Sequence, residues 1–137
     1  MQHSVGVTET LLKLREVIAP MISEESCVIT GLFHDLGKIG SFEKPNYVKN
    51  GNEWEVMKRN MKYKTNPDLI YIGLAPRSLF LISQHIKLSD EEAQAILYHD
   101  GQYIEANKEA AHRECPLTLL LTFADAWHTA VNEEGRK

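Results

Sequence analysis

The chain has 137 residues, of which 43% are hydrophobic and 25% charged, with a formal net charge of −4. This length fits one domain with a sizeable core, and the composition excludes a disordered or fibrous chain. The acidic balance gives no strong signal for binding to a nucleic acid backbone.

The apolar runs and the cysteines bear on the cellular location of the chain. The longest apolar stretch, 117–124, is interrupted by Thr118 and Thr122 and is far shorter than the ~20 residues of a membrane span. The N-terminus lacks a basic start followed by an apolar run, so we expect no signal peptide. Cys27 and Cys115 form no metal-type pair. One disulfide stays open as an alternative, but a reduced cytoplasmic protein is the better prediction.

Helical periodicity dominates the first part of the chain. It predicts a helix over residues 2–20, in which four apolar positions recur at helical spacing: Val7, Leu11, Leu14 and Ile18. His3 lies on the same face, four residues before the first of them. A second helix is predicted over 23–36, with Ser23 as its N-cap. Its expected apolar face consists of Val28, Ile29, Leu32, Phe33 and Leu36.

The segment from 41 to about 75 is the least regular, with turn residues at Pro45, Asn50-Gly51 and Pro67 and a short helix expected near 53–61. Residues 38–64 contain seven basic and three acidic side chains. Two interpretations are open: a solvated loop, or a lid that brings positive charge to an anionic substrate.

The second half of the chain is again helical. Helices are predicted over 77–85, 89–99, 105–113 and 116–131, the second of them with capping-box spacing between Ser89 and Glu92. We find no clean strand alternation. The sequence therefore predicts an all-α fold of five or six helices in a single domain over 1–137.

The doublet His34-Asp35 ends an apolar helix, where an imidazole and a carboxylate need a partner. Nitrogen and oxygen ligands of these types suit a divalent ion such as Mn, Fe, Co, Ni, Zn or Mg. Further candidates stand at both ends of the chain, His3 near the start and Asp125 in a late apolar helix. Asp125 also has an ordinary alternative, because it shares a helical stripe with threonines that could face water.

The order of these residues, with the stretches HSVGV, FHDLGK and LLTFADAW, resembles the HD superfamily of metal-dependent phosphohydrolases. The resemblance covers nearly the whole chain. It implies a helical bundle in which His3, His34, Asp35 and Asp125 hold one divalent metal ion. It also implies hydrolysis of a phosphoester, in which Asp35 could accept a proton from the attacking water.

The middle segment, 63–99, is similar to a bacterial subgroup of HD hydrolases that carries a Gly-His-Gly-Glu-Lys-Ser motif. The matching residues here are Gly73-Leu74-Ala75-Pro76-Arg77-Ser78. Leu74 stands at the motif histidine and precedes His99 by 25 residues, a separation similar to that of the histidines that hold a second metal in binuclear members. Leucine cannot bind a metal, so we expect a mononuclear site, with Leu74 facing the core or a pocket.

Other side chains are candidates for roles around the metal. His99 could contact phosphate or donate a proton, or could simply be favoured by a helix C-terminus. Lys38 could bind substrate phosphate or neutralise Asp35, and is otherwise a surface lysine. Arg77 is a candidate phosphate ligand near a helix N-terminus. His128 lies one turn after Asp125.

Three functions remain open at this stage. The first is a phosphohydrolase acting on a phosphorylated small molecule, with a nucleotide as one candidate. The second is a degenerate HD domain that binds metal or nucleotide as a sensor or assembly module, which Leu74 and Pro76 favour. The third is a helical interaction domain without a metal. The sequence specifies neither the metal nor the oligomeric state.

Overall fold

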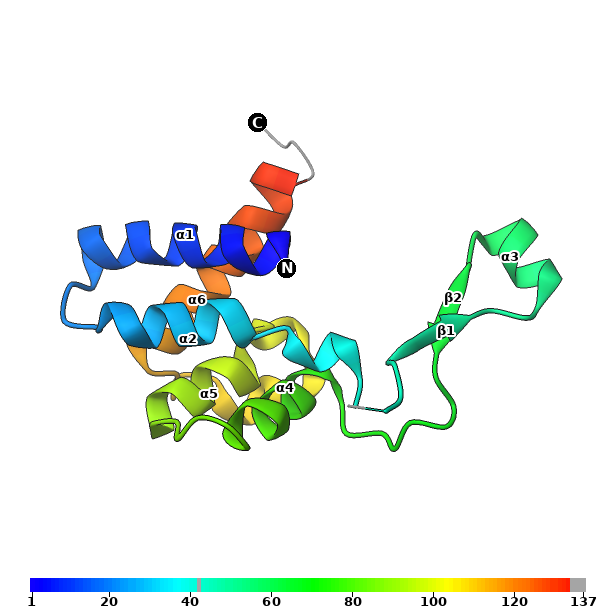
Figure 1. Ribbon diagram of the computed structural model, residues 1–137. Coiled ribbons are helices and arrows are strands. Elements are labelled where there is room, and N and C mark those ends of the chain that lie inside the picture. The colour runs from blue at the N-terminus through cyan, green and yellow to red at the C-terminus, as the bar shows by residue number, and fades with distance from the viewer. Residues whose placement is uncertain (42, 134–137) are drawn as a thin grey trace.

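The computed structural model describes residues 1–41 and 43–133, and it is built mainly of helices, which confirms the all-α prediction (Figure 1). Its elements in chain order are α1 (Gln2–Ile18), α2 (Glu24–Phe33), η1 (Leu36–Ile39), β1 (Tyr47–Lys49), α3 (Glu53–Arg59), β2 (Tyr63–Thr65), α4 (Leu74–Ser83), α5 (Asp90–Tyr98), η2 (Gly101–Tyr103), η3 (Glu105–Ala110), α6 (Pro116–Trp127) and η4 (His128–Glu133). No helix in the described ranges is both long and apolar enough to cross a lipid bilayer.

The core lies where α1, α2, α5 and α6 meet. Val7 and Leu11 of the predicted α1 face are fully buried, whereas Ile18 at the end of that helix is exposed. Leu117 and Leu121 of α6 pack in the same cluster. The periodicity of α1 therefore located its buried face correctly in the first three turns.

The predicted apolar face of α2 is confirmed only in part, because Ile29, Leu32, Phe33 and Leu36 are half-buried rather than buried. Val28 is exposed, and the buried stripe consists instead of Cys27, Thr30, Gly31 and His34. Thr30 is satisfied there because its Oγ1 donates a hydrogen bond to the carbonyl of Ser26. Gly31 allows α1 to come close, since a Cβ at this position would lie 2.4 Å from Oγ1 of Thr8. Small and internally hydrogen-bonded side chains thus replace large apolar ones at this contact.

Residues 47–65 form a hairpin arm that projects from the helices (Figure 1). Strands β1 and β2 pair antiparallel, with Val48 opposite Lys64, and α3 forms the tip. The strands were not predicted, because three residues are too few to show alternation. The arm, which holds five of the seven basic residues of the segment 38–64, therefore extends away from the bundle and does not fold over it as a lid.

Helix α4 begins at Leu74, three residues before the predicted start. Gly73 precedes it with a φ of +94°, which favours glycine. Pro76 is accommodated because amides in the first turn of a helix have no intrahelical partner. Against this turn packs η1, where the Gly37 amide donates to Ser78 Oγ at 2.7 Å. A Cβ at Gly37 would lie 2.1 Å from the Leu74 carbonyl oxygen, so the contact requires glycine.

The elements after α4 differ less from the predicted helices. The capping box of Ser89 and Glu92 at the start of α5 is confirmed. The polar helix expected at 105–113 is the 3₁₀-helix η3, and the last predicted helix divides into α6 and the π-helix η4. This π-helix brings the described C-terminal residues back to the start of α1.

Candidate metal centre

The ends of four helices supply the polar side chains of one cluster. His3 lies in the first turn of α1, and Asp125 in the last turn of α6. His34 and Asp35 lie between α2 and η1, and His99 caps the C-terminus of α5. Because the helices of this bundle pack on one another, these residues converge although up to 122 positions separate them in the chain.

The four predicted ligands lie within a few ångströms of one another. His3 Nε2 is 3.0 Å from Asp125 Oδ1 and 3.5 Å from Asp35 Oδ2. His34 Nε2 is 3.8 Å and 3.6 Å from the same two oxygens. Groups of donor atoms from His3, His34 and Asp35, and from His34, His99 and Asp125, each fall within 4.8 Å of one another. The structure therefore brings together all four residues, and His99 with them.

Three histidines of the cluster share one orientation. Nδ1 of His34 lies 2.8 Å from the Gly31 carbonyl oxygen, and Nδ1 of His99 lies 2.7 Å from that of Ile96. Nδ1 of His3 lies 2.6 Å from a carboxylate oxygen of Glu133. Each of these oxygens only accepts, so each Nδ1 carries a proton and Nε2 faces the cluster. Metal-ligating histidines are held in this way by outer hydrogen bonds.

The Nε2 atom of His34 supports a metal at the centre. Its side chain is fully buried, and within the described residues it is the one buried side-chain nitrogen or oxygen without a hydrogen-bond partner. Leaving such an atom unpaired costs about 1–3 kcal/mol. A divalent cation between this nitrogen and the two carboxylates would satisfy it, and imidazole with carboxylate is a suitable donor set. The residues present therefore fit a divalent metal ion.

The pKa shifts of His34 and Asp35 also favour the binding of a metal ion. Burial and the charge of His99 lower the pKa of His34, so its ring is neutral and able to ligate. Burial disfavours the charged form of Asp35, but hydrogen bonds from His99 and Lys38 and the charge of Lys38 hold the pKa of Asp35 well below its usual range. Burial opposes the charge on His99 as well, yet Asp35 and Asp100 raise the pKa of His99.

A model of the HD domain family matches residues 1–130. The chain belongs to the HD-domain family. Members of this family are generally metal-dependent hydrolases of the phosphohydrolase type, in agreement with the donor set. No curated protein and no solved structure matched the chain.

Lys38 and Arg77, the two candidate phosphate-binding residues of this HD domain, lie in different surroundings. Lys38 Nζ lies 2.9 Å from Asp35 Oδ2, and about half of its side chain is exposed. Burial opposes the charge of Lys38, but Asp35 raises its pKa, with smaller contributions from Asp125 and Tyr47. Arg77 is buried, and its guanidinium donates to the Ile70 carbonyl. In the described part of the chain no hydrogen bond or ion pair joins Arg77 to the cluster.

Sequence reasoning missed Glu133 and gave His128 little weight. Nε2 of His128 lies 3.3 Å from Glu133 Oε1, and its ring centroid is 5.7 Å from that of His3. Gly6 makes room for this ring, because a Cβ there would lie 2.0 Å from it. Glu133 stands eight residues after Asp125 in a polar run, where no sequence signal distinguishes it from a surface acid.

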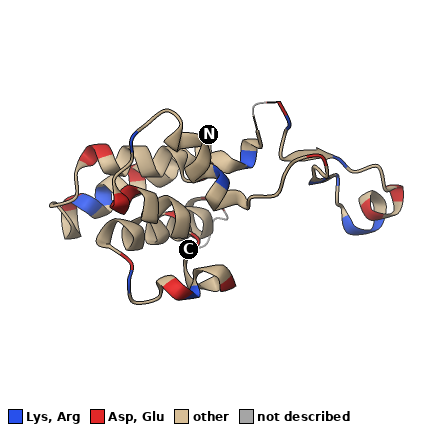
Figure 2. Cartoon of the chain, turned by 90° about the horizontal axis from the view of Figure 1, so that it is seen from below, with Lys and Arg blue, Asp and Glu red and all other residues tan. Residues whose placement is uncertain are grey.

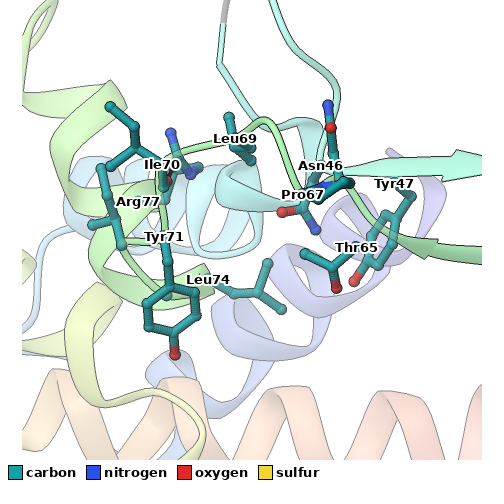
Figure 3. Close-up of a pocket in the computed structure, with 12 residues that line it drawn as sticks. Asn46, Tyr47, Thr65, Pro67, Leu69, Ile70, Tyr71, Leu74 and Arg77 are labelled. Carbon is teal, nitrogen blue, oxygen red and sulfur yellow. Dashed lines mark hydrogen bonds between the residues drawn. The ribbon is translucent and has the colours of Figure 1, made fainter.

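A cavity of about 380 Å³ lies between the start of α4 and the base of the hairpin arm (Figure 3). It is lined by Tyr47, Tyr71, Leu74 and Arg77, among others. Leu74 is 40% exposed and lines this cavity, whose lining residues do not include the cluster residues, so its predicted place in the core or in the metal-site pocket stays a prediction. The cavity adjoins η1, because Leu74 of its wall begins the helical turn against which Gly37 packs, two residues after Asp35.

Proposed function

We propose that this HD domain hydrolyses a phosphomonoester or phosphodiester, with a nucleotide as one candidate, at a single divalent metal ion. His3, His34, Asp35 and Asp125 would hold the ion. The observation that carries the proposal is the buried, unpartnered Nε2 of His34 beside two carboxylates. When bound, such an ion makes water a nucleophile at neutral pH and neutralises charge on the phosphoryl group.

His99, rather than Asp35, would transfer a proton in the reaction. The pKa of Asp35 is held far below its usual range, so this carboxylate stays ionised as a ligand and is a weak base. The pKa of His99 is raised above 6.5 and its Nε2 lies 3.5 Å from Asp35 Oδ1. A proton on Nε2 of His99 would lie beside the cluster, where it could be donated to the leaving oxygen of the substrate.

Lys38 and the cavity would recognise the two parts of the substrate. The ammonium group of Lys38 is half-exposed at the edge of the cluster, where it can bind a phosphate oxygen. The cavity beside it offers apolar and aromatic side chains, including Tyr47, Tyr71 and Leu74. Its volume is within the range of small-molecule sites, so it can take the organic group of a phosphoester.

A second candidate is an HD domain that binds a nucleotide and a metal without turnover. Leu74 and Pro76 favour it, because they place apolar side chains where the related motif has a histidine and an acid. The engagement of Arg77 by the Ile70 carbonyl points the same way, since among the described residues it leaves Lys38 as the Lys or Arg side chain that contacts the cluster.

A hydrolysis assay separates the two candidates. The Mn²⁺-loaded protein is incubated with nucleoside mono-, di- and triphosphates and with bis(p-nitrophenyl) phosphate, and released phosphate or nitrophenol is measured. The proposal expects turnover by the wild type, loss of it in His34→Ala, and full activity in the exposed-site control His85→Ala. Tight nucleotide binding without product from any compound supports the second candidate and contradicts the first.

A further inference from the structure

The hairpin arm exposes side chains that are common in protein interfaces. None of the described residues of α3 is buried. Trp54, Met57 and Tyr63 have exposed fractions of 58%, 81% and 61%, and the guanidinium of Arg59 lies 5.5 Å from the ring of Trp54. Tyrosine, tryptophan, methionine and arginine are enriched at the cores of protein–protein contacts. A two-stranded hairpin is only marginally stable by itself in water, so the arm gains most from a partner.

An apolar groove lies elsewhere on the same chain, between α1 and α6. It has a volume of about 430 Å³, and its walls are Leu14, Val17, Ile18, Phe123 and Trp127, with Thr10 and Lys13 beside them. Val17 is 81% exposed and Phe123 is 56% exposed. Leu14 lies eleven residues after His3, about 16 Å along the helix, so the groove is separate from the metal centre.

The arm and the rest of the chain carry opposite net charges. Residues 47–65 contain five basic and two acidic side chains, and the rest of the chain contains ten basic and seventeen acidic ones. The arm is therefore at +3 and the remainder at −7 when histidines are neutral. Figure 2 shows the arm extending away from the helical bundle, and most of the positions coloured red for Asp and Glu lie in the bundle. Charge alone thus favours contact between an arm and a bundle.

The groove and the arm of one molecule cannot meet. In Figure 1 the C-terminal end of α1, which carries Val17 and Ile18, and the arm lie on opposite sides of the molecule. A contact between these two surfaces must therefore join different molecules, as a heterologous interface does.

We propose that the hairpin arm docks into the α1–α6 groove of a second copy of this chain. The exposed aromatic and methionine side chains of the arm fill the apolar groove, while its excess positive charge faces the acidic bundle. A single-stranded nucleic acid is the competing occupant, since aromatic and basic side chains also bind such strands. The observations favour the second copy, because the arm also carries Glu53 and Glu55 and exposes apolar side chains, of which Met57 is 81% exposed.

The test uses one substitution on each surface. Trp54→Glu alters the arm, and Val17→Glu alters the groove. Both positions are more than half exposed, so neither change disturbs the core. The control is Tyr103→Glu, which is fully exposed and belongs to neither surface. Molar mass is measured by light scattering on size-exclusion chromatography over a range of protein concentrations, with circular dichroism as the check on folding.

The proposal expects the wild type and Tyr103→Glu to associate, and each of the other two variants to be monomeric at the same concentrations. An equimolar mixture of Trp54→Glu and Val17→Glu should regain a heterodimer, because one chain keeps the groove and the other keeps the arm. A wild type that stays monomeric, or a mixture that does not regain the dimer, overturns the proposal. A monomeric wild type that binds a labelled single-stranded oligonucleotide, and loses this binding in Trp54→Glu, assigns the arm to nucleic acid instead.

Discussion

Glu133 Oε1 accepts a hydrogen bond from His3 Nδ1 at 2.6 Å, although 130 positions separate the two residues. Because an ionised carboxylate only accepts, this bond fixes the proton of His3 on Nδ1 and leaves Nε2 for the cluster. The same bond, together with the charges of His3 and His128, lowers the pKa of Glu133. The described C-terminal end thus holds a candidate ligand in the first turn of α1.

Replacement of Glu133 by alanine should weaken metal binding without removing a ligand. The His3 ring then loses its outer acceptor, and loss of such a partner typically lowers metal affinity about tenfold to about hundredfold. Isothermal titration with Mn²⁺ measures the effect. Glu133→Gln should recover part of the affinity, since its amide oxygen can still accept from Nδ1. The exposed acid Glu25 provides the control as Glu25→Ala, and equal affinities of all these proteins would contradict the positioning role.

The sequence was sufficient to locate the cluster but not all of its surroundings. His34-Asp35 is a local signal at a helix end, and the resemblance to the HD family supplied His3 and Asp125. Glu133 depends on a π-helix that redirects the chain after Trp127, and no local pattern indicates that turn. The convergence of His99 with His34 required the packing of α2 against α5, which a single sequence does not specify.

The hairpin arm and the buried stripe of α2 were missed for physical reasons. Each strand of the arm has three residues, fewer than alternation needs to be visible. In α2 the fully buried positions hold small or polar side chains such as Gly31 and Thr30, so a search for large apolar residues selected the half-buried positions beside them. Helix existence was predictable, whereas the face that packs depended on close helix contact and internal hydrogen bonds.

The contributions of His34 and His99 should make the metal-free protein most stable near pH 6.5. The pKa of His34 is lowered from 6.5, so below that pH the unfolded chain binds a proton that the folded ring does not, and stability falls as pH falls. The pKa of His99 is raised from 6.5, so its contribution is complete below pH 6.5 and is lost as pH rises through the raised value.

Urea unfolding in the presence of a chelator, from about pH 5.5 to about pH 8.5, measures this profile. His99→Gln should remove most of the decline on the alkaline side, because glutamine does not titrate. The exposed histidine His85, changed to Gln, should leave the profile as it is. An alkaline decline that is the same in His99→Gln and in the wild type would show that other groups cause it.

Gly37→Ala should destabilise the protein by about 1–3 kcal/mol, the usual cost of overpacking. Its Cβ would meet the Leu74 carbonyl oxygen, a backbone atom that can move only with α4. Thermal unfolding followed by circular dichroism provides the measurement. Gly51→Ala is the matched control, since within the described residues a Cβ there meets nothing within 4 Å. If both variants unfold at the same temperature, the packing of η1 on α4 is not a constraint.

Lys38→Gln should lower kcat/KM for a hydrolysed phosphoester about tenfold to about hundredfold, the range expected when a charged hydrogen bond to phosphate is lost. Metal content should stay near that of the wild type, because Lys38 contacts Asp35 without belonging to the ligand set. Lys44→Gln, an exposed lysine outside the cluster, serves as the control. Unchanged kinetics in Lys38→Gln would remove this residue from the proposed site.

The central claim is that His34 and Asp35 hold one metal ion together with His3 and Asp125. The most direct measurement is metal per folded chain in the wild type, His34→Ala and Asp35→Ala, each loaded with Mn²⁺, desalted and analysed by plasma mass spectrometry, with circular dichroism to confirm folding. The account predicts about one ion per chain in the wild type and nearly none in either variant, because removal of either ligand breaks the same site. Equal metal content in all three folded proteins would contradict it and would make the doublet structural.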